Sequence, residues 1–190
     1  MKRSRTLLVA VASLVLPTLA SAHQYDYTYF DGGVVSRDSD RDRHDDFGLR
    51  LTGSADLTAP VAIFGEYVGA GSYEHFTAGG LFHTPIADFV DINFGASLEH
   101  ETLPRDSDTG LGIRGGLRWV FLDNRLELNP EILHTRIFHQ TDTSLRGTVL
   151  YGIAPQLDLA GALQVGDESR AELGLRYNFG NARTYERPRY

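Results

Sequence analysis

The chain has 190 residues and a formal net charge of −7, from 18 Lys and Arg against 25 Asp and Glu, and it contains no Cys. Without Cys it has neither a disulfide framework nor a thiolate site. An acidic chain that lacks a basic patch is also unsuited to nucleic-acid binding, because phosphate contacts need clustered Lys and Arg.

Residues 1–22 are typical of a secretory signal peptide. Basic residues at the start are followed by an apolar run over residues 6–16 and by an A-x-A sequence that ends at Ala22. The run is shorter than the roughly 20 residues of a membrane-spanning helix. We expect cleavage between Ala22 and His23 and export by the general secretory route.

Residues 23–179 form a series of segments in which apolar and polar side chains alternate, each closed by Gly, Pro, Asn or Asp. Alternation with a period of two is the pattern of a β-strand with one apolar face. We therefore predict an all-β fold, an up-and-down antiparallel transmembrane β-barrel of ten strands or, alternatively, eight. The expected strands span residues 24–36, 47–57, 61–70, 73–84, 89–101, 110–121, 126–139, 145–154, 157–166 and 169–179.

Two segments depart from this regular pattern. The seventh expected strand contains Pro130, which cannot donate a ladder hydrogen bond, so we expect a bulge or a strand end there. Residues 180–190 follow the last strand and carry no alternation, and we expect them to form a flexible periplasmic tail.

Alternation does not tell whether the apolar face lies inside, as in a lipocalin-like barrel, or outside against lipid. The connections favour a membrane barrel: the even-numbered ones are short, whereas the odd-numbered ones include the charged segments 37–46, 102–109 and 140–144. Short periplasmic turns and longer external loops are typical of outer-membrane barrels. Aromatic residues such as Trp119 and Phe121 fall near the expected periplasmic strand ends, where aromatic girdles form. An even number of strands also leaves both termini on the periplasmic side.

The last expected strand contains R-A-E-L-G-L-R-Y-N-F, with apolar residues on one parity and polar residues on the other. A polar residue, a Gly and two aromatics at the strand end resemble the closing-strand signal of bacterial outer-membrane barrels. The residues that carry this assembly signal are Glu172, Gly174, Tyr177 and Phe179.

Further motifs are Y-D-Y-T-Y-F-D-G-G-V-V, F-G-L-R-L-T-G-S-A-D-L and A-I-F-G-E-Y. With them the chain resembles the small OmpA-like and porin-like outer-membrane β-barrels, and more narrowly a subgroup discussed as quorum-sensing-linked surface antigens. The resemblance implies a monomer in the outer membrane of a Gram-negative bacterium, surrounded by outer-membrane lipid and lipopolysaccharide. It also implies insertion by periplasmic chaperones and the barrel assembly machinery, and no cofactor.

With the apolar face outward, the polar face would line the lumen with nearly balanced charges. We predict a structural ion-pair network, because isolated buried charges are prohibitively costly and narrow barrels are filled by side chains. A narrow channel for small solutes is the alternative. The predicted network comprises Arg50, Glu66, Asp91, Glu99, Arg114, Arg118, Glu127, Glu131, Arg146, Glu172 and Arg176.

The seven His residues do not predict a metal site, since their spacing does not bring three or four ligands together. A rim hydrolase or lipid-A-modifying enzyme would need a His beside Ser or a carboxylate. The candidates are His139 with Asp142 and Ser144, and His44 with Asp45 and Asp46, but loop polarity explains both clusters. We therefore expect an integral outer-membrane protein with a structural or surface-exposed envelope role and no catalysis. A soluble periplasmic lipocalin-like barrel is a further alternative.

Overall fold

The computed structural model describes residues 25–39, 45–122 and 124–179, and every regular element in these ranges is a β-strand. No helix in this part of the chain is long and apolar enough to cross a membrane. The strands are β1 (Tyr29–Ser39), β2 (Asp45–Thr58), β3 (Val61–Ala70), β4 (Tyr73–Ala87), β5 (Val90–Leu103), β6 (Asp106–Phe121), β7 (Leu126–Ile137), β8 (Gln140–Ala154), β9 (Leu157–Gly166) and β10 (Glu168–Asn178).

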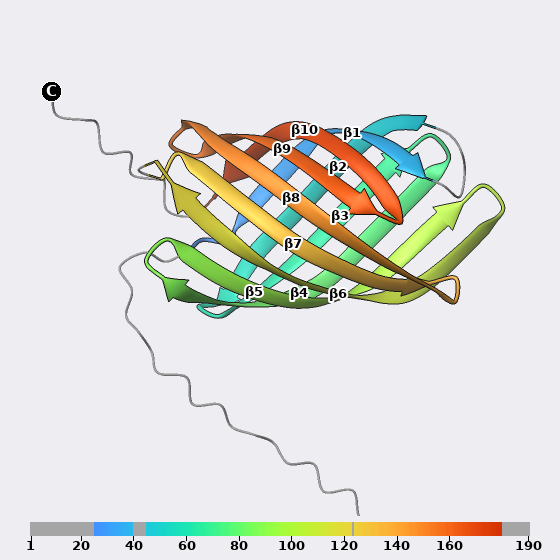
Figure 1. Cartoon of the computed structure of the whole chain (residues 1–190), viewed down its shortest axis with the longest axis horizontal. Helices are drawn as coiled ribbons and strands as arrows, with labels where there is room; N and C mark the ends of the chain where they lie inside the picture. Colours follow the sequence, from blue (N-terminus) through green and yellow to red (C-terminus); the bar gives the residue numbers. More distant parts are fainter. Residues whose placement is uncertain (1–24, 40–44, 123, 180–190) are drawn as a thin grey trace, which may run out of the picture.

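The ten strands form one closed antiparallel barrel (Figure 1), in which each strand pairs with its neighbours in sequence and β1 pairs with β10. The prediction of a ten-stranded up-and-down barrel is confirmed, and the alternative of eight strands is wrong. We call the end where β1 begins and β10 finishes the terminal end. The hairpins β1–β2, β3–β4, β5–β6, β7–β8 and β9–β10 lie at the opposite end.

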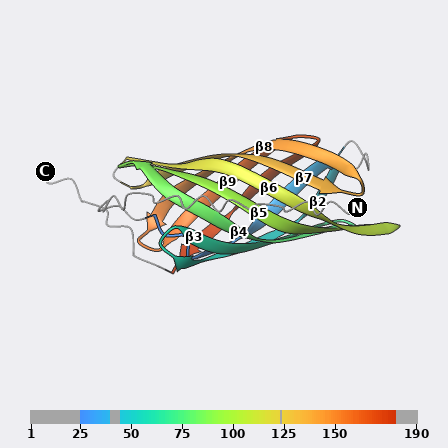
Figure 2. The same ribbon diagram turned by 90° about the horizontal axis from the view of Figure 1, so that it is seen from below.

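The expected difference in loop length is wrong for the segments 102–109 and 140–144. β5 continues to Leu103 and β6 begins at Asp106, while β8 begins already at Gln140, so both segments are mostly strand. Polar cross-strand contacts sustain these extensions, as where His100 Nδ1 lies 2.9 Å from Thr109 Oγ1. Figure 2 shows the β5–β6 hairpin projecting beyond the rest of the barrel. At the β5–β6 and β7–β8 hairpins, therefore, these polar residues lengthen the strands and do not form long loops.

Pro130 lies inside β7, so the expectation of a bulge or strand end is wrong. It pairs with Gly147 of β8. On the β6 side, the pairs Gly116–Glu131 and Trp119–Leu128 share one register, and the ladder lacks the pairs between them. The strand thus accommodates the missing donor by a local loss of pairing without a register shift. The register shifts that do occur adjoin the β2–β3, β4–β5 and β8–β9 turns at the terminal end.

The apolar faces of the strands point outward. Large apolar side chains such as Phe47, Leu111 and Leu163 are 69%, 66% and 66% exposed. Charged and polar side chains are buried instead, because they face the lumen. This arrangement is expected of a membrane barrel and is the reverse of a soluble barrel, whose apolar face fills its interior.

Apolar side chains inside the barrel gather in two small clusters, one toward each end. At the terminal end Tyr27 packs with Ala62 and Leu81, joined by the half-buried Tyr25 and Phe64. At the opposite end the buried residues Val35, Val68 and Tyr73 pack together with Leu103. The charged part of the lumen lies between these two clusters.

Candidate functional site

The lumen is the candidate site, because the predicted charged residues all project into it from the inward parity of their strands. Seven of them are buried: Glu66, Asp91, Glu99, Arg118, Glu127, Arg146 and Arg176. Arg50, Arg114, Glu131 and Glu172 are half-buried. The strands place them there because side chains alternate between the two faces, so one parity faces inward along the whole strand.

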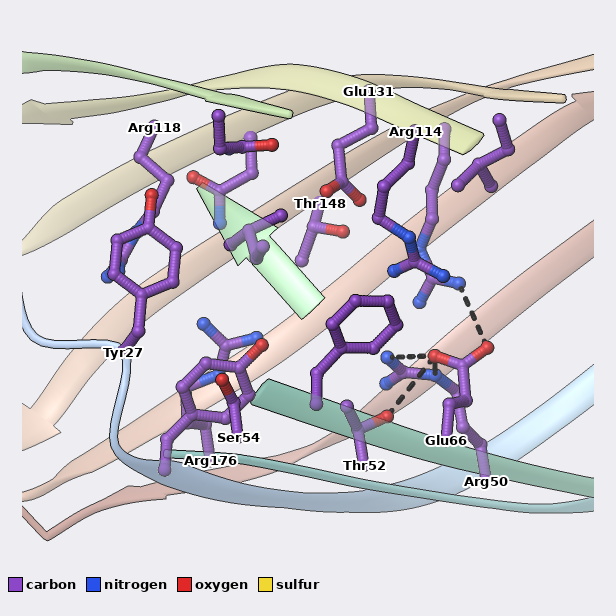
Figure 3. Close-up of a pocket in the computed structure, with 17 residues that line it drawn as sticks. Tyr27, Arg50, Thr52, Ser54, Glu66, Arg114, Arg118, Glu131, Thr148 and Arg176 are labelled. Carbon is purple, nitrogen blue, oxygen red and sulfur yellow. Dashed lines mark hydrogen bonds and ion pairs between the residues drawn. The ribbon is translucent and has the colours of Figure 1, made fainter. Parts of the chain in front are cut away.

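Glu66 of β3 is the centre of the ion-pair network (Figure 3). Its Oε2 atom lies 2.8 Å from Nη2 of Arg50 and accepts a hydrogen bond of 3.2 Å from the Thr52 hydroxyl. Its Oε1 atom lies 3.9 Å from Nη1 of both Arg146 and Arg170. Three guanidinium groups from different strands thus converge on a single carboxylate, which offsets the cost of burying its charge.

Further ion pairs extend this network toward the terminal end. Arg50 also lies 3.4 Å from Glu172 and 3.5 Å from Asp31, and Arg146 lies 2.5 Å from Glu172. Asp31 in turn pairs with Arg176 at 3.1 Å.

Beyond Arg176, Arg118 donates through Nε and Nη2 to the two oxygens of Glu127 at 2.9 and 3.0 Å. This is a bidentate pair, the strongest geometry available to a guanidinium and a carboxylate.

Several predicted residues are not brought into Arg–carboxylate pairs. Glu99 lies 3.0 Å from Nε2 of His75, and Asp91 lies 3.2 Å from Nδ1 of His83. Among the described residues, Arg114 and Glu131 form no ion pair. The Arg114 guanidinium lies over the Phe64 ring at 4.2 Å from its centre. The predicted set therefore contains both paired and unpaired charges.

The sequence analysis missed other members of the network. Asp31, Arg37, Glu168 and Arg170 are all in ion pairs, and Arg37 donates to Glu168 at 2.9 Å. Arg170 also contacts Glu168 and donates to the Tyr73 hydroxyl at 2.9 Å. Parity could have identified Arg170, since it lies on the polar face of the closing strand.

A short segment before β1, Tyr25–Thr28, folds into the terminal end of the barrel, and we call it the latch. Its backbone N–H at Tyr27 donates to Asp56 at 3.0 Å, and the Thr28 hydroxyl accepts from the Asp56 backbone N–H at 3.2 Å. The Arg118 guanidinium donates to the carbonyl of Asp26 at 2.9 Å. These contacts fasten the backbone of the latch to β2 and β6.

The Tyr27 side chain occupies the lumen and is only 3% exposed. It stacks on His83, with the ring centres 4.0 Å apart, and its hydroxyl donates to Asp91 at 3.0 Å. Arg118 lies 4.4 Å from the centre of the ring. Burial raises the pKa of the Tyr27 phenol, Arg118 lowers it and Asp91 raises it, so the net shift is upward. The phenol therefore stays a neutral hydrogen-bond donor.

Two of the cavities in the described part of the lumen lie in series. The first, about 80 Å³, lies beside the latch and is lined by Tyr27, and we call it the chamber. The second, about 60 Å³, lies toward the opposite end beside Tyr73. Glu66, Arg114 and Leu133 line both cavities and mark where they meet. In the described part of the lumen, the charged network thus leaves small cavities and no wide channel.

The proposed rim clusters do not assemble a catalytic site. His139 is exposed at the two-residue turn between β7 and β8, whereas Ser144 is buried on the lumen side of β8, so the two do not converge. His44 lies outside the described residues. Among the described residues, no group of three or more His, Cys, Asp or Glu could hold a metal ion.

The residues of the predicted assembly signal lie on both faces of β10. Glu172 is paired in the lumen, and Gly174 lies opposite Gly33 of β1. Tyr177 and Phe179 lie outside, and their rings are 5.0 Å apart in an edge-to-face arrangement. The backbone N–H of Phe179 donates to the Thr28 carbonyl at 3.0 Å, which joins the strand end to the latch. Recognition of these residues by the assembly machinery stays a prediction.

No known protein-family profile matches the chain, and no curated protein matches it. Among solved structures, the chain is similar to the KdgM porin, with a TM-score of 0.53 and 14% identity over 80% of this chain and 100% of the porin. A structure described as the KdgM porin in complex with disordered oligogalacturonate gives a TM-score of 0.52 at 14% identity, with the same coverage. The NanC porin gives 0.52 at 9% identity over 79% of this chain and 100% of NanC. At such identities the likeness concerns the fold alone.

The narrower resemblance to quorum-sensing-linked surface antigens gains no support from these matches and stays a prediction. What the comparisons and the closed ten-stranded sheet establish together is that the chain has the porin-like β-barrel fold of outer-membrane proteins.

Proposed function

We propose that the protein is an integral barrel of the Gram-negative outer membrane with a structural or surface-exposed envelope role and a lumen closed by ion pairs. The observation that carries this proposal is the combination of an apolar exterior with a charged, nearly filled interior. The exterior needs a lipid environment, and the interior leaves little space for transport.

The outer surface supports membrane insertion. Apolar side chains on all ten strands are exposed, and water would penalise that surface by roughly 25 cal/mol for each Å² left unburied. At the terminal end the outward rings of Trp119 and Phe121 lie 4.5 Å apart. The rings of Tyr177 and Phe179, at the end of β10, lie 5.0 Å apart. Aromatic rings at a strand end fit a membrane interface.

In the proposed orientation, the terminal end lies in the periplasm and the projecting β5–β6 hairpin lies outside the cell. Lipid and the glycolipid lipopolysaccharide would then surround the apolar band. A monomer suffices, because the closed sheet has no unpaired edge strand that needs a partner. Export through the signal peptide 1–22 and insertion by the barrel assembly machinery complete the proposed route.

Fractionation tests the proposal. The protein should remain in the detergent-extracted outer-membrane fraction, and its mobility on a denaturing gel should shift on boiling, because closed barrels resist detergent until heated. Release into buffer without detergent would contradict it and would favour the soluble alternative.

A narrow channel is the second candidate, because the two cavities lie in series along the lumen and the similar solved structures include porins. Steps of conductance in planar bilayers would support this candidate. Their absence would leave the closed barrel as the remaining reading.

Catalysis is not part of the proposal. The His139 and Ser144 side chains lie apart, and most of the buried Arg residues in the described lumen are paired with carboxylates. Unchanged lipid A and peptide profiles on expression are the expected result. A new lipid A species would overturn this view.

A further inference from the structure

Several polar groups that line the chamber have no partner in the described part of the protein. Several charged residues that line it, among them Arg50, Glu66 and Arg146, are in ion pairs. In the chamber, Arg114 and Glu131 are charged groups without an ion pair, and Figure 3 shows both pointing into the same space. A charge that faces a cavity without an ion-pair partner needs either water or a ligand for its stabilisation.

Glu131 lacks the partner that its position would supply. Arg146 of β8 lies directly opposite Glu131 in the ladder, and such cross-strand pairs of opposite charge normally interact. The Arg146 guanidinium turns instead to Glu172, at 2.5 Å. The Glu131 carboxylate therefore remains available to a molecule in the chamber.

Two amide oxygens in the chamber are also unsatisfied. The Oδ1 atoms of Asn93 and Asn129 are buried without a hydrogen-bond partner, and Asn93 is only 2% exposed. Buried polar atoms of this kind are rare in proteins and point to a missing donor.

The register of the strands places two of these acceptors in one row. Asn93 of β5 and Glu131 of β7 both pair with Gly116 of β6, so the three positions form one row across the barrel wall. Gly116 contributes no side chain to that row. The Glu131 side chain lies over Gly116 instead, with its Cγ 2.7 Å from where a Gly116 Cβ would be, and so extends toward Asn93, whose backbone is about two strand spacings, or about 10 Å, from its own.

We propose that the chamber is a binding site for a small zwitterion, an α-amino acid. Glu131 and the Oδ1 atoms of Asn93 and Asn129 would accept hydrogen bonds from its ammonium group, and the Arg114 guanidinium would bind its carboxylate. The size agrees: a chamber of about 80 Å³ offers roughly six water-sized positions, close to the heavy atoms of a small amino acid.

The charge pattern argues for this class of ligand. The chamber has unsatisfied acceptors on Glu131, Asn93 and Asn129, and unsatisfied guanidinium donors on Arg114 and at Nε of Arg176. A simple anion would therefore leave Glu131 and both amides unpaired. A simple cation would leave Arg114 unpaired. A molecule with an ammonium group at one end and a carboxylate at the other satisfies both sets, because it offers several donors and one bidentate acceptor.

The test uses the purified full-length mature protein, refolded in detergent in the presence of each probe so that slow access through the closed ends cannot limit binding. The probes are L-alanine, acetate, ethylamine and glycine betaine, a zwitterion without N–H donors. We expect L-alanine to bind with a dissociation constant at or below about 1 mM in calorimetry. Acetate, ethylamine and betaine should each bind at least tenfold more weakly.

Variants assign the contacts. Glu131→Gln and Arg114→Gln should each weaken the binding of L-alanine at least tenfold, whereas Glu74→Gln, which changes an exposed carboxylate, should leave it unchanged. Should the lumen variants not refold, Asn93→Ala provides a milder change with the same expected direction.

If no probe binds, the chamber holds water only and the proposal is wrong. It is equally wrong if L-alanine binds but Glu131→Gln, Arg114→Gln and Asn93→Ala leave its affinity intact. Neither result bears on membrane insertion, which fractionation tests separately.

Discussion

Gly33 of β1 and Gly174 of β10 lie directly opposite each other at the seam that closes the barrel, and neither position has room for a side chain. A Cβ atom at Gly174 would lie 2.5 Å from the Gly32 carbonyl oxygen and 2.8 Å from the Gly33 Cα. Both obstacles are backbone atoms, which cannot move aside without opening the seam. The two glycines therefore allow the first and last strands to approach closely.

Gly174→Ala should consequently destabilise the barrel. Overpacking of this kind costs about 1–3 kcal/mol in free energy of unfolding. The denaturant midpoint of the heat-modifiable band should fall. Gly147→Ala is the matched control, because no atom lies within 4 Å of a Cβ built there. Equal midpoints for the two variants would show that the seam tolerates a side chain.

Glu66→Gln should destabilise the barrel more than any single exposed change. The substitution removes one carboxylate charge and leaves Arg50, Arg146 and Arg170 facing a neutral amide. Removing one partner of a buried ion pair costs about 3 kcal/mol. Glu74→Gln, on the exposed face of β4, is the control and should leave the unfolding midpoint unchanged. If the unfolding midpoint falls no further in Glu66→Gln than in the control, water readily compensates for the lost carboxylate charge.

Substitutions in the turn between β7 and β8 should stabilise the barrel. Phe138 and His139 have φ angles of 51° and 59°, a left-handed conformation that side chains with a Cβ adopt at a cost. Asn-Gly is the preferred pair in such two-residue hairpins. We expect the double variant Phe138→Asn, His139→Gly to raise the free energy of unfolding by about 1 kcal/mol.

The β5–β6 turn provides the control for that variant. Arg105 is not among the described non-glycine residues with positive φ, so Arg105→Gly relieves no strain and adds freedom to the unfolded chain. It should leave stability unchanged or lower it slightly. A gain from Arg105→Gly as large as that of the double variant would rule out relief of strain as the cause.

The latch makes a prediction about access to the chamber. Tyr27→Ala removes the ring that stacks on His83 and the hydroxyl bound to Asp91. The chain has no Cys, so a Cys introduced by Thr148→Cys in the chamber wall is a specific reporter. We expect its reaction with a small charged thiol reagent to become at least about tenfold faster when Tyr27→Ala is combined with it.

Two variants serve as controls for the latch experiment. Tyr27→Phe keeps the ring, so its effect should be smaller than that of Tyr27→Ala. Tyr151→Ala removes a Tyr from the exposed outer face of β8 and should not change the rate. An unchanged rate in Tyr27→Ala would mean that the latch does not limit access.

The sequence predicted the strands and their faces well, because each depends on a local pattern. Alternation around Val90–Leu98 is enough to identify β5 and to place Asp91 and Glu99 in the lumen. It does not reveal where a hairpin stops being strand, since polar residues such as His100 and Thr109 suit a loop and an extended hairpin equally. The local pattern therefore predicted the positions of the strands correctly and the ends of the β5–β6 and β7–β8 hairpins wrongly.

The ion-pair partners inside the lumen depend on which side chains meet across the barrel. No local sequence pattern encodes the distance between side chains on strands that are far apart in the sequence. Arg146 illustrates this: its neighbour in the ladder is Glu131, yet it pairs with Glu172 from β10. The latch was likewise hidden, because Y-D-Y-T-Y reads as the start of a strand. Only closure of the sheet brings Tyr27 against His83 and Asp91.

Phe179→Ala should slow assembly of the barrel in the membrane more than Tyr190→Ala does. Phe179 ends the closing strand, where its ring packs edge-to-face against Tyr177 and its backbone N–H bonds to Thr28. Tyr190 lies outside the described residues and beyond the predicted signal. The measurement is the rate at which the heat-modifiable form appears after synthesis.

Phe94→Ala is the control that distinguishes the effect of an aromatic ring at the strand end from the effect of losing apolar surface. Phe94 is 56% exposed on the outer face of β5 and Phe179 is 60% exposed, so the two substitutions remove similar amounts of lipid-facing surface. If recognition depends on the strand end, Phe94→Ala should assemble faster than Phe179→Ala, with a similar final stability. A slower rate for Tyr190→Ala than for Phe179→Ala would instead assign the signal to the tail, because the aromatic that closes the chain would then outweigh the one that closes the barrel.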